Sequence, residues 1–89
     1  MANSPTLHAV IFRIGALNCA APAGIVREIL PRLPATRIPG VAEVVEGLVN
    51  VRGSLLPVLD GHRLLQQERR AGDEGAIVVV EVAGRRYGL

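Results

Sequence analysis

The side chains best able to take part in chemistry are a few charged groups inside apolar segments. Arg52 lies between two apolar runs, residues 48–51 and 55–59, and Glu28 lies within a third, residues 25–30. A guanidinium is a planar cation that binds carboxylates through paired hydrogen bonds, and arginine is common among the residues that dominate protein interfaces. A carboxylate in an apolar segment should lie where it meets water or a partner, because burying it alone is costly. This chemistry favours recognition of another protein over catalysis.

The sequence lacks the spacing that catalytic and cofactor-binding residues require. Neither serine lies in a Gly-x-Ser-x-Gly arrangement, and residues 72–75 carry acids where a phosphate-binding loop needs lysine. Cys19 is the only cysteine, which excludes an internal disulfide and a thiolate zinc cluster. It would be an activated nucleophile only if the fold brought it beside His8 or His62. We therefore predict no enzymatic activity, no metal ion and no cofactor.

Length and composition limit the remaining function classes. The chain has 89 residues, 49% of them hydrophobic, which suits one small folded domain, and no apolar run reaches the roughly 18 residues of a membrane span. Residues 1–5 lack the basic and apolar regions of a secretory signal, so we expect a cytoplasmic protein without direct membrane insertion. Phe12 and Tyr87 are the only aromatic residues, too few for stacking nucleic-acid bases. We therefore predict protein partners and no nucleic acid.

The order of apolar runs and breakers predicts an all-β, barrel-like fold. β-Branched segments separated by glycine, proline and asparagine indicate six or seven short strands without the strand–helix–strand rhythm of an α/β protein. One short helix is expected at residues 61–70 with Asp60 as its N-cap, and one or two helical turns could occupy residues 41–46 before Gly47. Residues 1–6 are expected to form a disordered tail. The expected strands are residues 7–14, 19–21, 25–30, 48–51, 55–59 and 77–82, with a return strand beginning at residue 86.

Residues 48–59 are predicted to form a β-hairpin. Gly53 allows the positive φ of a tight reversal, and the Asn50 side chain can brace such a turn by bonding nearby backbone. Arg52 then lies at the turn, either solvated or held out for a partner. Pro57, in the second strand, has no N–H group and is expected at a sheet edge or at a bulge.

Four motifs follow one another along the chain. They are Val26-Arg27-Glu28-Ile29, Thr36-Arg37-Ile38-Pro39-Gly40, Gly47-Leu48-Val49-Asn50-Val51-Arg52-Gly53 and Leu56-Pro57-Val58-Leu59-Asp60. In order and spacing they resemble the CheW-like adaptor domain of bacterial chemotaxis signalling. The combination of Asn-x-Arg-Gly with Pro-Val-x-Asp is the most specific part, and the resemblance extends from residue 7 to residue 89.

This resemblance implies a fold, a role and a set of partners. The family fold would consist of two linked, five-stranded, SH3-like β-barrel subdomains. The role would be non-catalytic: coupling the tip of a methyl-accepting chemoreceptor to the regulatory domain of a CheA-type histidine kinase. The positions that match family binding residues, together with the two that shape the turn, are Val26, Glu28, Gly47, Arg52, Asn50 and Gly53.

The chain departs from the family pattern in two places. Gly61-His62-Arg63 follows Asp60 where the family usually has Leu-Arg, and the sequence ends at residues 85–89, where family domains continue. Residues 1–89 are therefore expected to form one partial domain. Exposed strand edges in a partial barrel would favour self-association, for example by exchange of strands between copies. A second function thus stays open, a stand-alone structural or regulatory homo-oligomer that has lost the usual partners.

Overall fold

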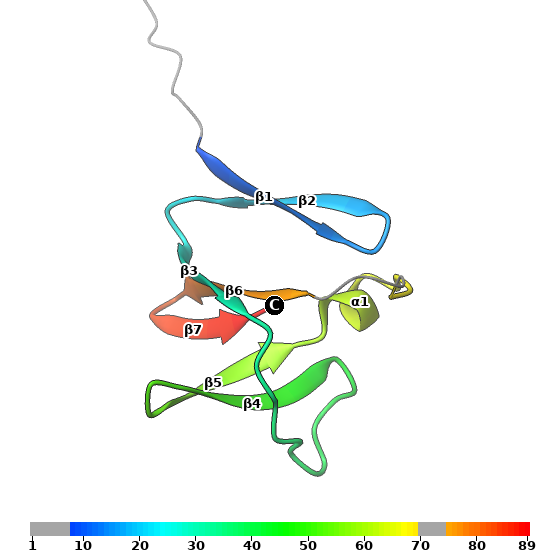
Figure 1. Ribbon diagram of the computed structural model, residues 1–89, viewed down its shortest axis with the longest axis vertical. Coiled ribbons are helices and arrows are strands. Elements are labelled where there is room, and N and C mark those ends of the chain that lie inside the picture. Colours follow the sequence, from blue (N-terminus) through cyan, green and yellow to red (C-terminus); the bar gives the residue numbers. More distant parts are fainter. Residues whose placement is uncertain (1–7, 70–74) are drawn as a thin grey trace, which may run out of the picture.

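The chain folds into two β-sheets and one short helix (Figure 1). The computed structural model describes residues 8–69 and 75–89, so the tail predicted at residues 1–6 lies outside the described residues. Strands dominate, and the all-β prediction is confirmed. Within the described residues the elements are β1 (Ala9–Ile14), β2 (Leu17–Pro22), β3 (Val26–Pro31), β4 (Val45–Val51), β5 (Ser54–Leu59), α1 (Gly61–Leu64), β6 (Ala76–Val82) and β7 (Arg85–Gly88).

The strands are divided between a hairpin and a larger mixed sheet. Within the described residues β1 and β2 pair only with each other, as an antiparallel hairpin. The other five strands form a sheet in the order β3-β6-β7-β5-β4. All neighbours in it are antiparallel except β5 and β7, which run parallel and share one paired position, Val58 with Gly88. Two-residue turns join β4 to β5 and β6 to β7, so the nearest antiparallel pairs form locally.

The hydrophobic core lies on one face of the five-stranded sheet. Its buried side chains are Val49, Leu56, Val58, Ile77 and Val79. They come from alternate positions of β4, β5 and β6, because successive side chains of a strand point to opposite faces. Val49 and Val58 are each only 1% exposed. β6, an inner strand between β3 and β7, is buried on its other face too, through Val78 and Val80.

The five-stranded sheet curls until its two edge strands are linked. β3 and β4 are at opposite ends of the strand order, yet the connector after β3 reaches β4. There Thr36 and Leu48 exchange two backbone hydrogen bonds of 2.8 and 2.9 Å. The Arg32 guanidinium also lies 3.5 Å from the Glu46 carboxylate. These contacts produce the closed, barrel-like arrangement expected from the sequence.

Gly47 allows the connector to approach β4 this closely. It has a φ of +148°, and a Cβ added to it would overlap the carbonyl oxygen of Thr36. The prediction that a short helix occupies residues 41–46 and ends at Gly47 is wrong. The Val45 N–H bonds the Ala42 carbonyl in a turn, and the chain then enters β4 as an extended strand that contains Gly47.

The helix predicted at residues 61–70 is much shorter in the structure, where α1 spans Gly61–Leu64. Its predicted start is confirmed. Asp60 is the N-cap, and its carboxylate accepts hydrogen bonds of 3.0 and 3.3 Å from two backbone N–H groups of the first turn. This match is expected because capping depends on residues that are adjacent in the sequence.

The helix ends early because a tertiary contact redirects the chain. Gln66 adopts a left-handed φ of +54°. The Gln67 side chain then accepts a 3.2 Å hydrogen bond from the backbone N–H of Ala16, in the turn between β1 and β2. The contact holds Gln66 and Gln67 outside the helix, although their helix propensity alone would favour extending it.

Two strand predictions also need correction. β2 begins at Leu17 rather than at residue 19, since the reversal before it takes only Gly15 and Ala16. Pro57 was expected at an edge or a bulge, but β5 is an inner strand, and Pro57 pairs in register with Leu48 of β4. The missing N–H is tolerated there because β7 pairs with β5 at Val58 and not at Pro57.

Replacing Gly47 with alanine should destabilise the fold. The added Cβ would collide with the Thr36 backbone, and the alanine would have to keep a φ that L-residues rarely adopt. We therefore expect a loss of about 2 kcal/mol or more in the free energy of unfolding. Urea denaturation followed by circular dichroism measures this loss. Gly24→Ala is the matched control, because nothing lies within 4 Å of its added Cβ, and it should change stability by less than about 0.5 kcal/mol. Equal midpoints for the two variants would contradict the role assigned to Gly47.

Candidate functional site

An ion pair at the rim of the barrel unites the two charged residues singled out in the sequence. Glu28 on β3 is in register with Val79, and cross-strand partners share a face, so its carboxylate points to the core side of the sheet. A carboxylate there needs a cation. Arg52 supplies it from the turn between β4 and β5, with its Nη2 2.5 Å from Glu28 Oε1. The Arg52 side chain remains 69% exposed, whereas that of Glu28 is 30% exposed.

The turn that carries Arg52 is held in an unusual conformation. Arg52 and Gly53 both adopt left-handed φ values, +50° and +87°, the pattern of a two-residue type I′ hairpin turn. The predicted brace is confirmed: Asn50 Oδ1 accepts a 2.9 Å hydrogen bond from the Gly53 N–H. Sequence reasoning assigned the positive φ to Gly53 alone. A left-handed arginine is strained by about 1 kcal/mol or more, and such strain is common at functional sites.

The structure brings together four of the six residues predicted to bind a partner. Glu28, Asn50, Arg52 and Gly53 form one cluster, called the rim site below. Gly47 lies roughly 15 Å along β4 from Arg52, against the connector, where it serves barrel closure. Val26, in register with Val80, is next to a bulge that separates it from Glu28 on β3. Participation of any of these residues in binding stays a prediction.

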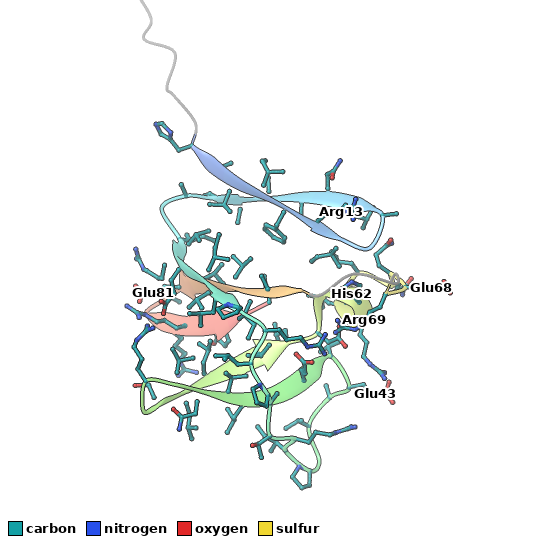
Figure 2. The ribbon with its side chains drawn as sticks, viewed as in Figure 1. Arg13, Glu43, His62, Glu68, Arg69 and Glu81 are labelled. Carbon is teal, nitrogen blue, oxygen red and sulfur yellow. The ribbon has the colours of Figure 1, made fainter. Side chains whose placement is uncertain are left out.

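Sequence reasoning missed a second group of charges near the rim site. Glu81 on β6 accepts hydrogen bonds of 3.2 Å each from Arg27 Nη2 and Arg86 Nε. Figure 2 shows Glu81 at the end of the sheet where β6 turns into β7. The two-residue turn before β7 sets the register that places Arg86 opposite Glu81. A tight turn at residues 83–84 was the signal in the sequence from which this pair could have been predicted. Arg86 and Arg27 hold the pKa of the Glu81 carboxyl below its ordinary value.

The nucleophile hypothesis for Cys19 gains no support from its contacts. Cys19 lies on β2 opposite Phe12, with its Sγ 3.9 Å from the Leu17 carbonyl oxygen. His62 instead lies beside Asp60, with Nδ1 3.9 Å from Oδ1.

Within residues 8–69 and 75–89, no three metal-binding side chains are grouped so that they could hold one ion. No helix in the described part of the chain is long and apolar enough to cross a membrane.

Comparison with known families supports the resemblance seen in the motifs. The model of the CheW-like domain matches residues 8–89, which is nearly the whole chain. The chain belongs to the CheW-like domain family. This membership confirms the family predicted from the four motifs, and it fits the SH3-like, all-β architecture of the closed sheet.

Individual relatives agree with membership in the CheW-like family. The chemotaxis protein CheW of Rhizobium meliloti (strain 1021) is 33% identical over 81 residues, 90% of this chain and 52% of that protein. The protein PilI of Pseudomonas aeruginosa is 47% identical over 49 residues, 55% of this chain and 28% of PilI. The crystal structure of the scaffolding protein TtCheW from Thermoanaerobacter tengcongensis superposes with a TM-score of 0.84 at 27% identity, covering 93% of this chain and 57% of TtCheW. The chain thus spans about half the length of CheW and TtCheW, and less of PilI.

The charges around Glu81 predict a pH-dependent stability of this CheW-like domain. A carboxyl whose pKa is lowered by folding adds stability above its unfolded-state pKa, and this contribution is lost as the pH falls through the folded-state pKa. Glu81→Gln should therefore be less stable than the wild type at neutral pH, and the two should converge in strong acid. Urea unfolding midpoints measured across this pH range test the expectation.

Glu68→Gln is the matched control for that experiment. Glu68 is an exposed glutamate that Figure 2 shows at the opposite side of the molecule from Glu81. This variant should follow the wild type at every pH. A stability difference between wild type and Glu81→Gln that persisted unchanged into strong acid would refute the assigned role of the carboxylate.

Proposed function

We propose that the chain acts as a non-catalytic adaptor in chemotaxis-type signalling, coupling a chemoreceptor to a CheA-type histidine kinase through protein contacts. The observation that carries the proposal is the exposed guanidinium of Arg52, held at the rim of the barrel by Glu28. Support comes from the family and from two relatives, one named a chemotaxis protein and the other a scaffolding protein. The proposed partners are the kinase regulatory domain and the cytoplasmic tip of a methyl-accepting chemoreceptor, so the chain would work in the cytoplasm.

The rim site suits this role because Arg52 is ordered before a partner arrives. A free arginine side chain carries roughly 2 kcal/mol of rotamer entropy, part of which is lost on binding. Here the left-handed turn and the contact with Glu28 already restrict it. Glu28 engages Nη2, and within the described residues the other guanidinium nitrogens make no ion pair or hydrogen bond. They are available to a carboxylate or carbonyl of the partner.

The other predicted site residues contribute to binding in different ways under this proposal. Asn50 and Gly53 maintain the turn that presents Arg52. Gly47 acts at a distance, since closing the barrel keeps β3 close to the hairpin. Val26 is half-buried beside the β3 bulge, where it would add apolar contact next to Glu28.

The variant Arg52→Asn separates binding from folding. It removes the guanidinium but leaves Asn-Gly, the dipeptide that most favours a type I′ turn. We expect affinity for a kinase regulatory domain or a receptor-tip fragment to fall by about tenfold or more, a typical loss for an interface arginine. The thermal midpoint should change little, because the relief of left-handed strain offsets the loss of the ion pair with Glu28. Isothermal titration calorimetry and thermal unfolding measure the two effects.

Arg37→Asn is the control for this experiment. Arg37 is an exposed arginine on the connector, and its side chain has no ion pair within the described residues. The control variant should bind like the wild type. Equal affinities of Arg52→Asn and wild type would refute the role of the rim site, and a wild-type chain that bound neither fragment would refute the adaptor function.

A strand-exchanged homo-oligomer is the second candidate function. Within the described residues β1 and β2 have no strand partner other than each other, and Ile11 on β1 is 68% exposed. An open strand edge next to apolar side chains can pair with a second copy. This candidate predicts a dimer or larger species by light scattering at micromolar concentration, with no affinity for either fragment. A monomer that binds the kinase domain would exclude it.

A further inference from the structure

A groove opens beside the rim site because two parallel strands diverge. β5 and β7 are paired only at Val58 and Gly88. Nearer the β6–β7 turn they separate, leaving a groove of about 630 Å³ whose borders include Leu55 of β5 and Arg85 of β7. Val79 contributes to its lining from the core. We call this feature the β5–β7 groove.

The two borders of the groove differ in chemistry. Continuing the parallel register from the single paired position would set Leu55 opposite Arg85 on the same face of the sheet. Leu55 is 66% exposed and gives the β5 border an accessible apolar side chain. Pro57, also on the β5 border, has no N–H to offer an added strand. The groove therefore suits insertion of side chains better than addition of a β-strand.

The charge around the groove is positive and incompletely neutralised. Arg27 and Arg86 share one carboxylate, Glu81, and Arg52 is matched by Glu28. The side chain of Arg85, which is exposed, makes no ion pair or hydrogen bond within the described residues. Four arginines thus face two glutamates, so a carboxylate from a partner would reduce the excess positive charge, and arginine binds carboxylates through two parallel hydrogen bonds.

We propose that the β5–β7 groove is a specificity pocket for an acidic, amphipathic segment of the partner, with an apolar side chain against Leu55 and an adjacent carboxylate on Arg85. This inference rests on the proposed adaptor function, since the segment belongs to the kinase domain or the receptor tip that binds the rim site. Arg52 supplies the contact at the end of the groove, and Arg85 selects partners that carry an acid at the matching position. The chemistry of the occupant follows from the opposed charge and the exposed leucine.

Charge reversal at Arg85 tests the pocket. In calorimetric titrations of the full chain with the kinase regulatory domain and with the receptor-tip fragment, Arg85→Glu should weaken binding to one of them by about tenfold or more. Arg85→Lys, which keeps the charge but loses the paired hydrogen bonds, should bind with an affinity between those of wild type and Arg85→Glu. Raising the salt concentration should reduce the difference in affinity between wild type and Arg85→Glu, because salt screens interactions between exposed charges. Arg37→Glu, a reversal on the connector, should not change either affinity.

A compensating charge change on the partner identifies the segment that occupies the β5–β7 groove. Acidic residues on the surface of the affected partner are changed one at a time to lysine, and one such change should restore binding of Arg85→Glu while weakening binding of the wild type. If Arg85→Glu bound like the wild type while Arg52→Asn bound weakly, the proposed role of the β5–β7 groove would be wrong. The adaptor function would still hold. Binding of neither fragment by the wild type would overturn both. Self-association that Arg85→Glu abolishes would assign the groove to a second copy and also overturn the proposal.

Discussion

The backbone bridge between Thr36 and Leu48 is the contact on which the shape of the molecule depends. By strand order β3 and β4 are the two edges of the five-stranded sheet, and an open sheet would keep them a full sheet width apart. The bridge ties the connector after β3 to β4 and curls the sheet around its core. It forms only because Gly47 has no side chain to block it. A single glycine thus controls the distance between the two edges.

The rim site is a consequence of that closure. Glu28 and Arg52 are 24 residues apart and belong to opposite edges of the sheet, so they meet only when the barrel is curled. The half-buried carboxylate needs the cation, and the left-handed turn places the cation within reach. The sequence marked both as charges without a structural role, but their pairing could not be predicted because it depends on strand order. The same holds for Glu81, whose two arginines come from β3 and β7.

Predictions from the sequence succeeded where local chemistry decides the structure. The brace from Asn50 and the N-cap at Asp60 involve residues two or three apart, and both are present. Predictions failed where distant contacts override propensity. The helix expected at residues 61–70 ends after one turn because Gln67 turns toward the β1–β2 hairpin, and residues 41–46 form no helix because their last two residues belong to a strand of the barrel.

We propose that closure of the barrel creates a rigid docking surface for a protein partner at one end of the sheet. Titration of ¹⁵N-labelled chain with the unlabelled kinase regulatory domain tests it most directly, because each backbone amide reports its own environment. We expect shifts or broadening of the amide signals of Glu28, of the turn around Arg52 and of β7, with little change near α1 at the opposite end. Perturbations centred on α1 and the connector, with the turn around Arg52 unaffected, would contradict it.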